Sequence, residues 1–276
     1  MRTISNDNKD NSRKERKLTE KQFEILQLAY RFRFLTTTGL AVYVGQSQTN
    51  AAFKRLSVLY RRGFLSRRFD ASYRLRNRPA EYYLAAKAIP LLRARLTHPN
   101  ERELKLIYGR SKSSLQIVDR SLAIFNICLE LRRLYGQKLS FATDTQFNTF
   151  RFNFLPDPLP DALATFDSKT DRKRHLFVDY FDDGASIEVH GRKLANYMEY
   201  QADGDWDGTE LAFPTILIVC QSPTLLRRTA KRIRQLERQA DSEISFRLID
   251  LASLEELNSL SKAVWLDPIR QNLTAL

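Results

Sequence analysis

Residues 18–64 read LTEKQFEILQLAYRFRFLTTTGLAVYVGQSQTNAAFKRLSVLYRRGF and predict three consecutive helices. Thr19 precedes an apolar-periodic segment, as a helix N-cap does. Thr36 and the two threonines after it open a short second helix. Ser47 is expected to cap a third helix that ends at Gly63, because glycine readily terminates a helix. The stretch therefore predicts a compact helical module.

Two strand-like segments follow, residues 64–69 and 80–84, and the basic residues 70–79 join them. Three helices followed by a β-hairpin with a basic tip are typical of a winged helix-turn-helix domain. We place this DNA-binding domain at residues 18–97. Residues 1–17 are highly charged and almost without large aliphatic side chains, so they predict a disordered basic tail.

The third helix is the predicted recognition helix, because its outward face suits the base edges of a major groove. Its inward face is expected to carry Thr49, Ala52, Phe53, Leu56, Leu59 and Tyr60. The predicted outward face consists of Ser47, Asn50, Ala51, Lys54, Val58 and Arg61. Phosphate contacts are expected at the helix flanks and in the wing, from Arg55, Arg62, Arg67, Arg68, Arg74, Arg76 and Arg78. The alternative is an ordinary solvated surface.

Charge separates the two parts of the chain. The formal net charge is +13, and residues 1–97 hold 21 Lys/Arg against 7 Asp/Glu, whereas the rest of the chain holds 24 against 25. The excess positive charge therefore belongs to the N-terminal module, which favours double-stranded DNA as the partner. An RNA-binding module is less favoured, because no motif typical of RNA recognition is present.

No apolar run approaches the roughly 20 residues of a membrane helix, and the polar N-terminus does not resemble a signal peptide. We therefore expect a cytoplasmic protein without a membrane partner. Cys128 and Cys220 lie in apolar segments and predict reduced core thiols.

The remainder of the chain has an α/β pattern. Residues 98–136 are expected to form a linker and a buried connecting helix, which either docks two domains or lies in a homodimer interface. Residues 137–276 form the second predicted domain. Its expected strands are 139–142, 162–166, 176–181, 215–220 and 245–249, and its helices are 186–202 and 223–240.

Two carboxylates in this domain suggest a catalytic site. Asp161 begins one predicted strand and Asp179 lies within the next, so both are candidate ligands of Mg²⁺ or Mn²⁺. Such an ion polarises a phosphodiester. Lys193 and Tyr197 share one face of the following helix and are expected to point toward the acids. Aspartates at strand ends are also common in structural roles, so a site without metal is the alternative.

Blocks of sequence distributed over the chain resemble the replication-relaxation family of plasmids and integrative elements. The resemblance rests on residues 18–26, 30–36, 55–63, 82–84, 160–161, 177–179, 193–197 and 213–219. It implies a winged helix joined to a core similar to PD-(D/E)XK restriction endonucleases. It also implies that Asp161, Asp179, Lys193 and Tyr197 are the site residues, as in members that resemble mobilisation relaxases.

The chain departs from the family pattern at Phe181, where the second acid of the strand is usual. Two interpretations therefore stay open for a sequence-selective DNA-binding protein of a mobile element. One is a metal-dependent nicking enzyme that acts in replication or mobilisation. The other is a non-catalytic regulator whose nuclease-like domain serves dimerisation or partner docking.

Overall fold

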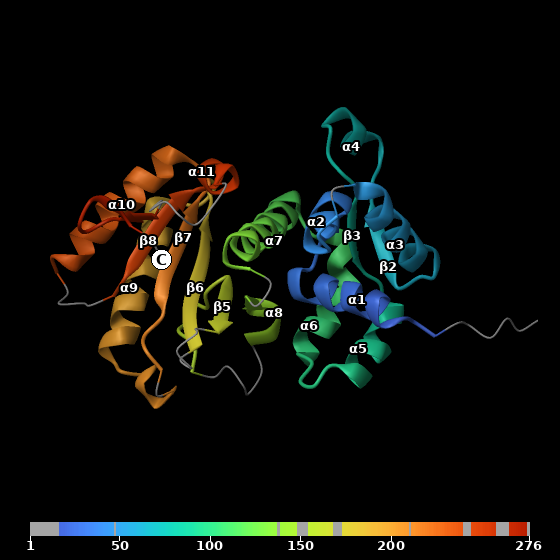
Figure 1. Ribbon diagram of the computed structural model, residues 1–276, viewed down its shortest axis with the longest axis horizontal. Coiled ribbons are helices and arrows are strands. Elements are labelled where there is room, and N and C mark those ends of the chain that lie inside the picture. Colours follow the sequence, from blue (N-terminus) through green and yellow to red (C-terminus); the bar gives the residue numbers. More distant parts are fainter. Residues whose placement is uncertain are drawn as a thin grey trace, which may run out of the picture.

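The chain folds into two units, each built on a β-sheet, with one long helix between them (Figure 1). The predicted mixed α/β class is therefore confirmed. The predicted tail over residues 1–17 lies outside the described residues except for Lys17. The computed structural model describes residues 17–46, 48–136, 139–147, 154–167, 173–209, 211–239, 244–257 and 265–274.

The N-terminal unit combines helices with a small antiparallel sheet of strand order β1-β3-β2. Its elements are α1 (Glu20–Phe32), β1 (Leu35–Thr36), α2 (Thr37–Tyr43), α3 (Thr49–Arg61), β2 (Leu65–Arg68), α4 (Ala71–Leu75), β3 (Glu81–Leu84), η1 (Ala86–Ala88) and α5 (Ile89–Arg95).

Short-range hydrogen bonds set the helix boundaries in this unit. The Thr19 hydroxyl accepts from the Gln22 amide, and the Gln22 side chain accepts from the Thr19 amide, which makes a capping box. Thr36 caps α2 by accepting from the Gly39 amide at 3.1 Å. Gly63 follows α3 with a φ of 75°, a conformation that glycine adopts without steric cost. These predicted boundaries are confirmed, whereas the predicted cap Ser47 lies outside the described residues.

Two expectations for this unit were wrong. The predicted loop between the hairpin strands contains α4, which forms because the Asp70 carboxylate accepts from the amides of Ser72 and Tyr73. On α3, Ala52, Leu56 and Leu59 are buried as predicted, but three predicted inward residues are exposed. The helix contacts its neighbours along a narrower face than its apolar residues suggest, which leaves Thr49, Phe53 and Tyr60 in solvent.

The connection between the units is largely helical. It contains α6 (Glu101–Leu106), η2 (Ile107–Lys112) and α7 (Leu115–Tyr135), and α7 ends at Gly136, as predicted. Helix α7 contacts α1, α2 and β1 on one side and β6 and α11 on the other. Its buried side chains from Phe125 onward belong to a core cluster that includes residues of both units. Within this chain, α7 therefore docks the two units together.

The second unit is a mixed seven-stranded sheet of order β10-β9-β8-β7-β6-β5-β4, whose centre, β6-β7-β8, is parallel. All five predicted strands are confirmed within a few residues, while β9 and β10 were missed. The elements are β4 (Ser140–Thr143), α8 (Asp144–Phe147), β5 (Ala162–Asp167), β6 (Lys173–Phe181), α9 (Ile187–Ala202), η4 (Asp207–Thr209), β7 (Thr215–Cys220), α10 (Pro223–Glu237), β8 (Phe246–Asp250), α11 (Leu251–Glu256), β9 (Trp265–Asp267) and β10 (Asn272–Thr274).

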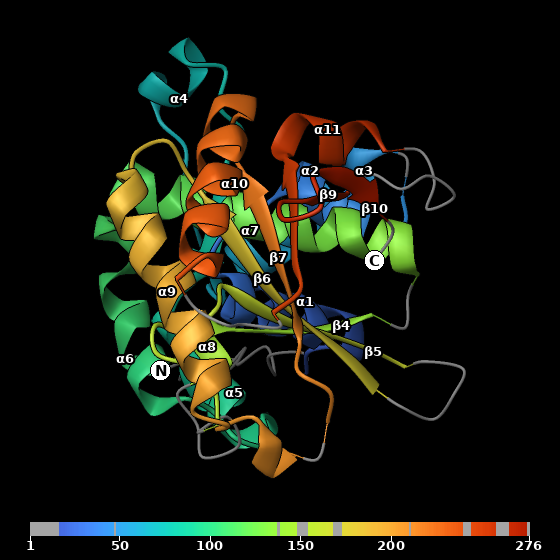
Figure 2. The ribbon, with the colours of Figure 1, turned by 90° about the vertical axis from the view of Figure 1, so that its left-hand side faces the viewer.

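Helices cover both faces of this sheet (Figure 2). Side chains alternate along β6, so Val178 and Tyr180 face α7, whereas Phe177 and Phe181 pack with residues of α9 and α10. Asp179 therefore points toward α9. Both cysteines are buried free thiols. Among the described residues, none of the helices has the length and apolar character needed to cross a membrane.

The contact between α2 and α7 leaves no room for a side chain at Gly39. A Cβ atom there would lie 2.7 Å from Cε1 of the buried Phe125. We expect Gly39→Ala to lower the free energy of unfolding by about 1–3 kcal/mol, because the new methyl group must displace the buried Phe125 ring from its packing. This clash should exceed the gain of about 0.5–1 kcal/mol that alanine brings to a helix interior. Urea denaturation measures the difference.

Gly109→Ala is the matched control, because a Cβ atom at Gly109 meets no atom within 4 Å. An unchanged stability of Gly39→Ala relative to this control would contradict the close packing of α2 on α7.

Candidate functional site

The open face formed by α3, β2 and α4 is strongly basic. Residues 48–80 hold nine Lys/Arg and one acidic residue, Asp70. Four of the predicted contact residues, Ala51, Arg55, Val58 and Arg62, are partly buried at the helix flank. The predicted contact residues that are exposed are Asn50, Lys54, Arg61, Arg67, Arg74 and Arg76. Helix α4 projects from this part of the molecule (Figure 1).

Aromatic rings lie among these cations. Phe53 is 49% exposed and Tyr60 is 42% exposed, although we expected both to be buried. The Arg67 guanidinium lies 5.2 Å from the Tyr60 ring centroid and 5.7 Å from that of Phe69. Arg74 also lies over Phe69. The contact with Tyr60 holds Arg67 against α3, and the contacts with Phe69 orient Arg67 and Arg74 within the β2–α4 segment.

Arg68 and Arg78 have a different role from the one predicted. Both are bound to the fully buried Glu81, at 3.6 and 2.7 Å. Arg78 also pairs with Asp119 of α7 at 2.5 Å, and Arg68 donates to the Ser113 carbonyl at 2.7 Å. These two arginines therefore fix the hairpin of β2 and β3 to the start of α7, where their charge is already compensated.

The four predicted site residues of the second unit do come together. Lys193 Nζ donates to Asp179 Oδ1 at 2.5 Å, and the Tyr197 hydroxyl donates to Asp179 Oδ2 at 2.8 Å. Asp161 is adjacent, because its amide donates to Asp179 Oδ1 at 3.1 Å. Asp179 is 0% exposed. The alternation along β6 and the four-residue spacing on α9 produce this meeting.

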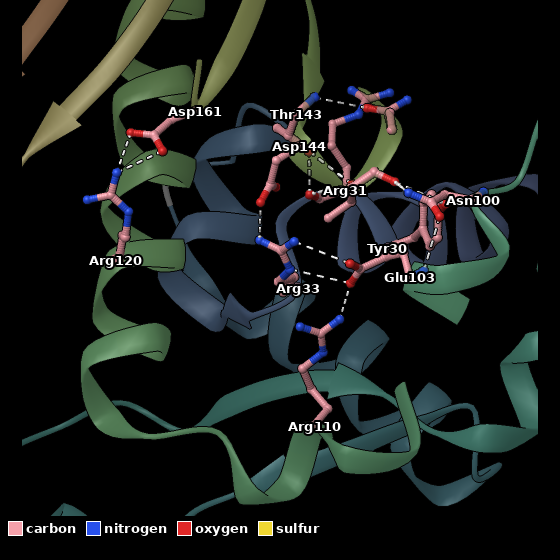
Figure 3. Close-up of polar contacts among 12 residues, drawn as sticks. Tyr30, Arg31, Arg33, Asn100, Glu103, Arg110, Arg120, Thr143, Asp144 and Asp161 are labelled. Carbon is pink, nitrogen blue, oxygen red and sulfur yellow. Dashed lines mark hydrogen bonds and ion pairs between the residues drawn. The ribbon is translucent and has the colours of Figure 1, made fainter. Parts of the chain in front are cut away.

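Arg120 of α7, which the sequence reasoning missed, completes the cluster (Figure 3). Its Nη2 donates to both carboxylate oxygens of Asp161, at 2.8 and 2.7 Å, and its Nη1 donates to Asp182 at 2.9 Å. The Tyr180 amide donates to Asp161 at 2.8 Å. A charged residue beside an apolar helix segment was the only sequence signal for Arg120.

Burial and these hydrogen-bond partners shift the pKa values of Asp179, Lys193 and Tyr197. Burial raises the pKa of Asp179, and Lys193 and Tyr197 oppose part of that rise. Burial disfavours the charge of Lys193, but the carboxylates of Asp179 and Asp161 outweigh it and raise its pKa. Burial and the neighbouring Asp179 raise the pKa of Tyr197, which therefore stays a hydrogen-bond donor.

A second polar network joins α1 and α6 to the edge of the large sheet (Figure 3). Arg33 pairs with Glu103 at 3.2 Å and with Asp144 at 2.8 Å, and Arg110 also binds Glu103. The buried Asn100 donates to the Thr145 carbonyl at 3.1 Å. The two units are thus joined by ion pairs as well as by the core around α7.

Comparison of the sequence with models of known protein families identifies a match. The sequence model described as replication-relaxation matches residues 26–216 of the 276. This chain belongs to the replication-relaxation family. The match runs from α1 to the start of β7, so it contains the basic face and all four site residues. Neither the curated proteins nor the solved structures yield a match to the chain.

The positions of Asp161 and Asp179 show whether they suit the predicted Mg²⁺ or Mn²⁺ ion. All four carboxylate oxygens of Asp161 and Asp179 accept hydrogen bonds from protein groups, and Arg120 and Lys193 already supply two positive charges. Within the described parts of the chain, no group of three or more His, Cys, Asp or Glu is placed to hold a metal ion. The donor set in this arrangement does not fit Mg²⁺ or Mn²⁺, which prefer an octahedron of oxygens.

Proposed function

We propose that this replication-relaxation protein binds double-stranded DNA of a plasmid or integrative mobile element in its replication, mobilisation or regulation. The observation that carries the proposal is the basic face of α3 and the wing, where exposed cations surround a helix that is free on its outer side. Membership of the family links the chain to replication. The N-terminal unit is the proposed reader of the DNA sequence.

The order of elements supports a winged helix. The chain runs α1, β1, α2, α3, β2 and β3, with β1 added to the hairpin of β2 and β3. In such a domain the helix after the turn enters the major groove and the wing lies along the backbone. Asn50 and Lys54 on α3 have the donors and acceptors that read base edges. Arg67, Arg74 and Arg76 are the proposed phosphate contacts.

The second unit has the mixed sheet and flanking helices that a PD-(D/E)XK-like core would have, and we propose that it acts without cleaving DNA. The charges of its site residues are balanced within the protein, since Arg120 and Lys193 neutralise Asp161 and Asp179. Adjacent residues of α7 contact both units, Asp119 through Arg78 and Arg120 through Asp161. The cluster therefore sets the position of the wing relative to the sheet. Homodimerisation stays a prediction that size measurement in solution would test.

One assay distinguishes binding from nicking. Supercoiled plasmid carrying the DNA that flanks this gene would be incubated with wild type and Asp161→Asn, with and without Mg²⁺ or Mn²⁺. We expect a mobility shift by wild type and no relaxation of the plasmid under any of these conditions, because the carboxylate oxygens are occupied.

Metal-dependent nicking that Asp161→Asn abolishes would overturn the non-catalytic interpretation and favour a relaxase-like nuclease. Failure of wild type to shift this plasmid or its fragments at low salt would contradict DNA binding itself. Fragments from an unrelated plasmid serve as the control for sequence selectivity.

A further inference from the structure

A cavity between the two units has a lining that no part of the proposed DNA-binding function uses. It encloses about 190 Å³. Helices α1, α2 and α7 and the segment around β4 contribute its walls. Its lining residues are mostly apolar or aromatic, with two arginines.

Among the described residues, Arg31 and Arg132 have no acidic partner. The Nε atom of each is shielded from solvent and has no hydrogen-bond partner. Within the described residues neither guanidinium forms an ion pair, and no Asp or Glu lines the cavity. The Arg132 guanidinium lies over the Tyr43 ring, 4.5 Å from its centroid.

Two guanidinium groups of like charge line this small cavity and repel each other. Burial lowers the pKa of Arg31, and the neighbouring Arg132 lowers it further, although Tyr43 and Cys128 oppose the change. Uncompensated charge in such a place is costly unless a partner of opposite sign is present. A bound anion would remove this cost at both arginines.

The other residues that line the cavity suit an organic ligand better than an inorganic ion. Phe32, Phe125 and Phe141 supply aromatic walls, and Leu129 and Leu139 add aliphatic surface. Ligand sites commonly combine such apolar walls with a few polar groups that fix orientation. We propose that this cavity binds a small organic anion, with an aromatic or other apolar body and one phosphate or carboxylate group. The anionic group would lie between Arg31 and Arg132.

The test uses the full chain and isothermal titration calorimetry with phenyl phosphate, benzoate and inorganic phosphate, and with benzyl alcohol as the neutral analogue. We expect saturable binding of at least one aromatic anion and at least tenfold weaker binding of benzyl alcohol. Tighter binding of phenyl phosphate would identify the group as phosphate, and tighter binding of benzoate would identify it as carboxylate. Absence of saturable binding by both aromatic anions would overturn the proposal.

Variants then locate the site. Arg31→Gln and Arg132→Gln should each weaken binding of the best anion at least tenfold, while Arg102→Gln, an exposed arginine of α6, should not change it. Without ligand, Arg31→Gln should keep or raise the melting temperature, because it removes an unpaired charge. Retained affinity in both cavity variants would place the binding elsewhere and overturn the proposal. Because no DNA is present, these results do not depend on the proposed function.

Discussion

Replacing Asp179 with alanine is expected to lower the free energy of unfolding by about 3–5 kcal/mol, the usual effect of removing one partner of a buried ion pair. The side chain is 0% exposed and binds Lys193, Tyr197 and the Asp161 amide. Its loss leaves Lys193 charged and without its closest partner. This is a large share of the roughly 5–15 kcal/mol by which a domain is stable. Equilibrium unfolding in urea measures it.

Two comparisons make this expectation specific. Asp203→Ala, at an exposed position after α9, should change stability by less than about 0.5 kcal/mol. The double variant Asp179→Leu/Lys193→Met should recover much of the loss, since an apolar pair can replace a buried ion pair at little cost. If Asp179→Ala were as stable as Asp203→Ala, the buried network would not stabilise the second unit.

The second large effect concerns DNA. Reversing two exposed charges of α3, in Lys54→Glu/Arg61→Glu, is expected to weaken binding about 100-fold or more, because each lost contact is worth about 1–3 kcal/mol and the new charges repel phosphate. The plot of log binding constant against log salt concentration should also become less steep, by about 2 in the magnitude of its slope. Fluorescence anisotropy over a salt series measures both quantities.

The matched control reverses the same charges elsewhere. Lys105→Glu/Arg102→Glu changes one lysine and one arginine at exposed positions of α6, which lies apart from α3 in both ribbon views (Figures 1 and 2). It should bind DNA within about threefold of wild type, since only long-range screened repulsion remains. Equal losses in the two double variants would mean that net charge, and not the α3 face, governs binding.

Local signals account for most of what could be predicted. The caps at Thr19 and Thr36 and the glycine after α3 act over a few residues, so the sequence predicts the helices they bound. The run 215–220 is apolar throughout and forms the central strand β7. The Asp70 cap is equally local, and the same principle would have predicted α4.

The orientation of side chains and the identity of their ion-pair partners were harder to predict. Phe53 and Tyr60 were placed inward by the helical period, yet both are exposed, and the Tyr60 ring contacts Arg67 of β2. Arg68 and Arg78 look like phosphate contacts in the sequence, but the buried Glu81 binds both. The partner of each of these side chains comes from a distant part of the chain, and no local sequence pattern identifies it.

The sequence by itself determined the basic N-terminal part, the α/β character of the rest and the shared helix face of Lys193 and Tyr197, because charge distribution and helix and strand periods are local properties. Only the tertiary structure brought Arg120 onto Asp161 and placed Arg31 and Arg132 on one cavity, with no acidic partner among the residues that the structure describes. These residues come from elements far apart in the chain, and the packing of α7 against both units decides their neighbours. Whether a carboxylate binds a metal or an arginine depends on that packing and not on its place in a motif.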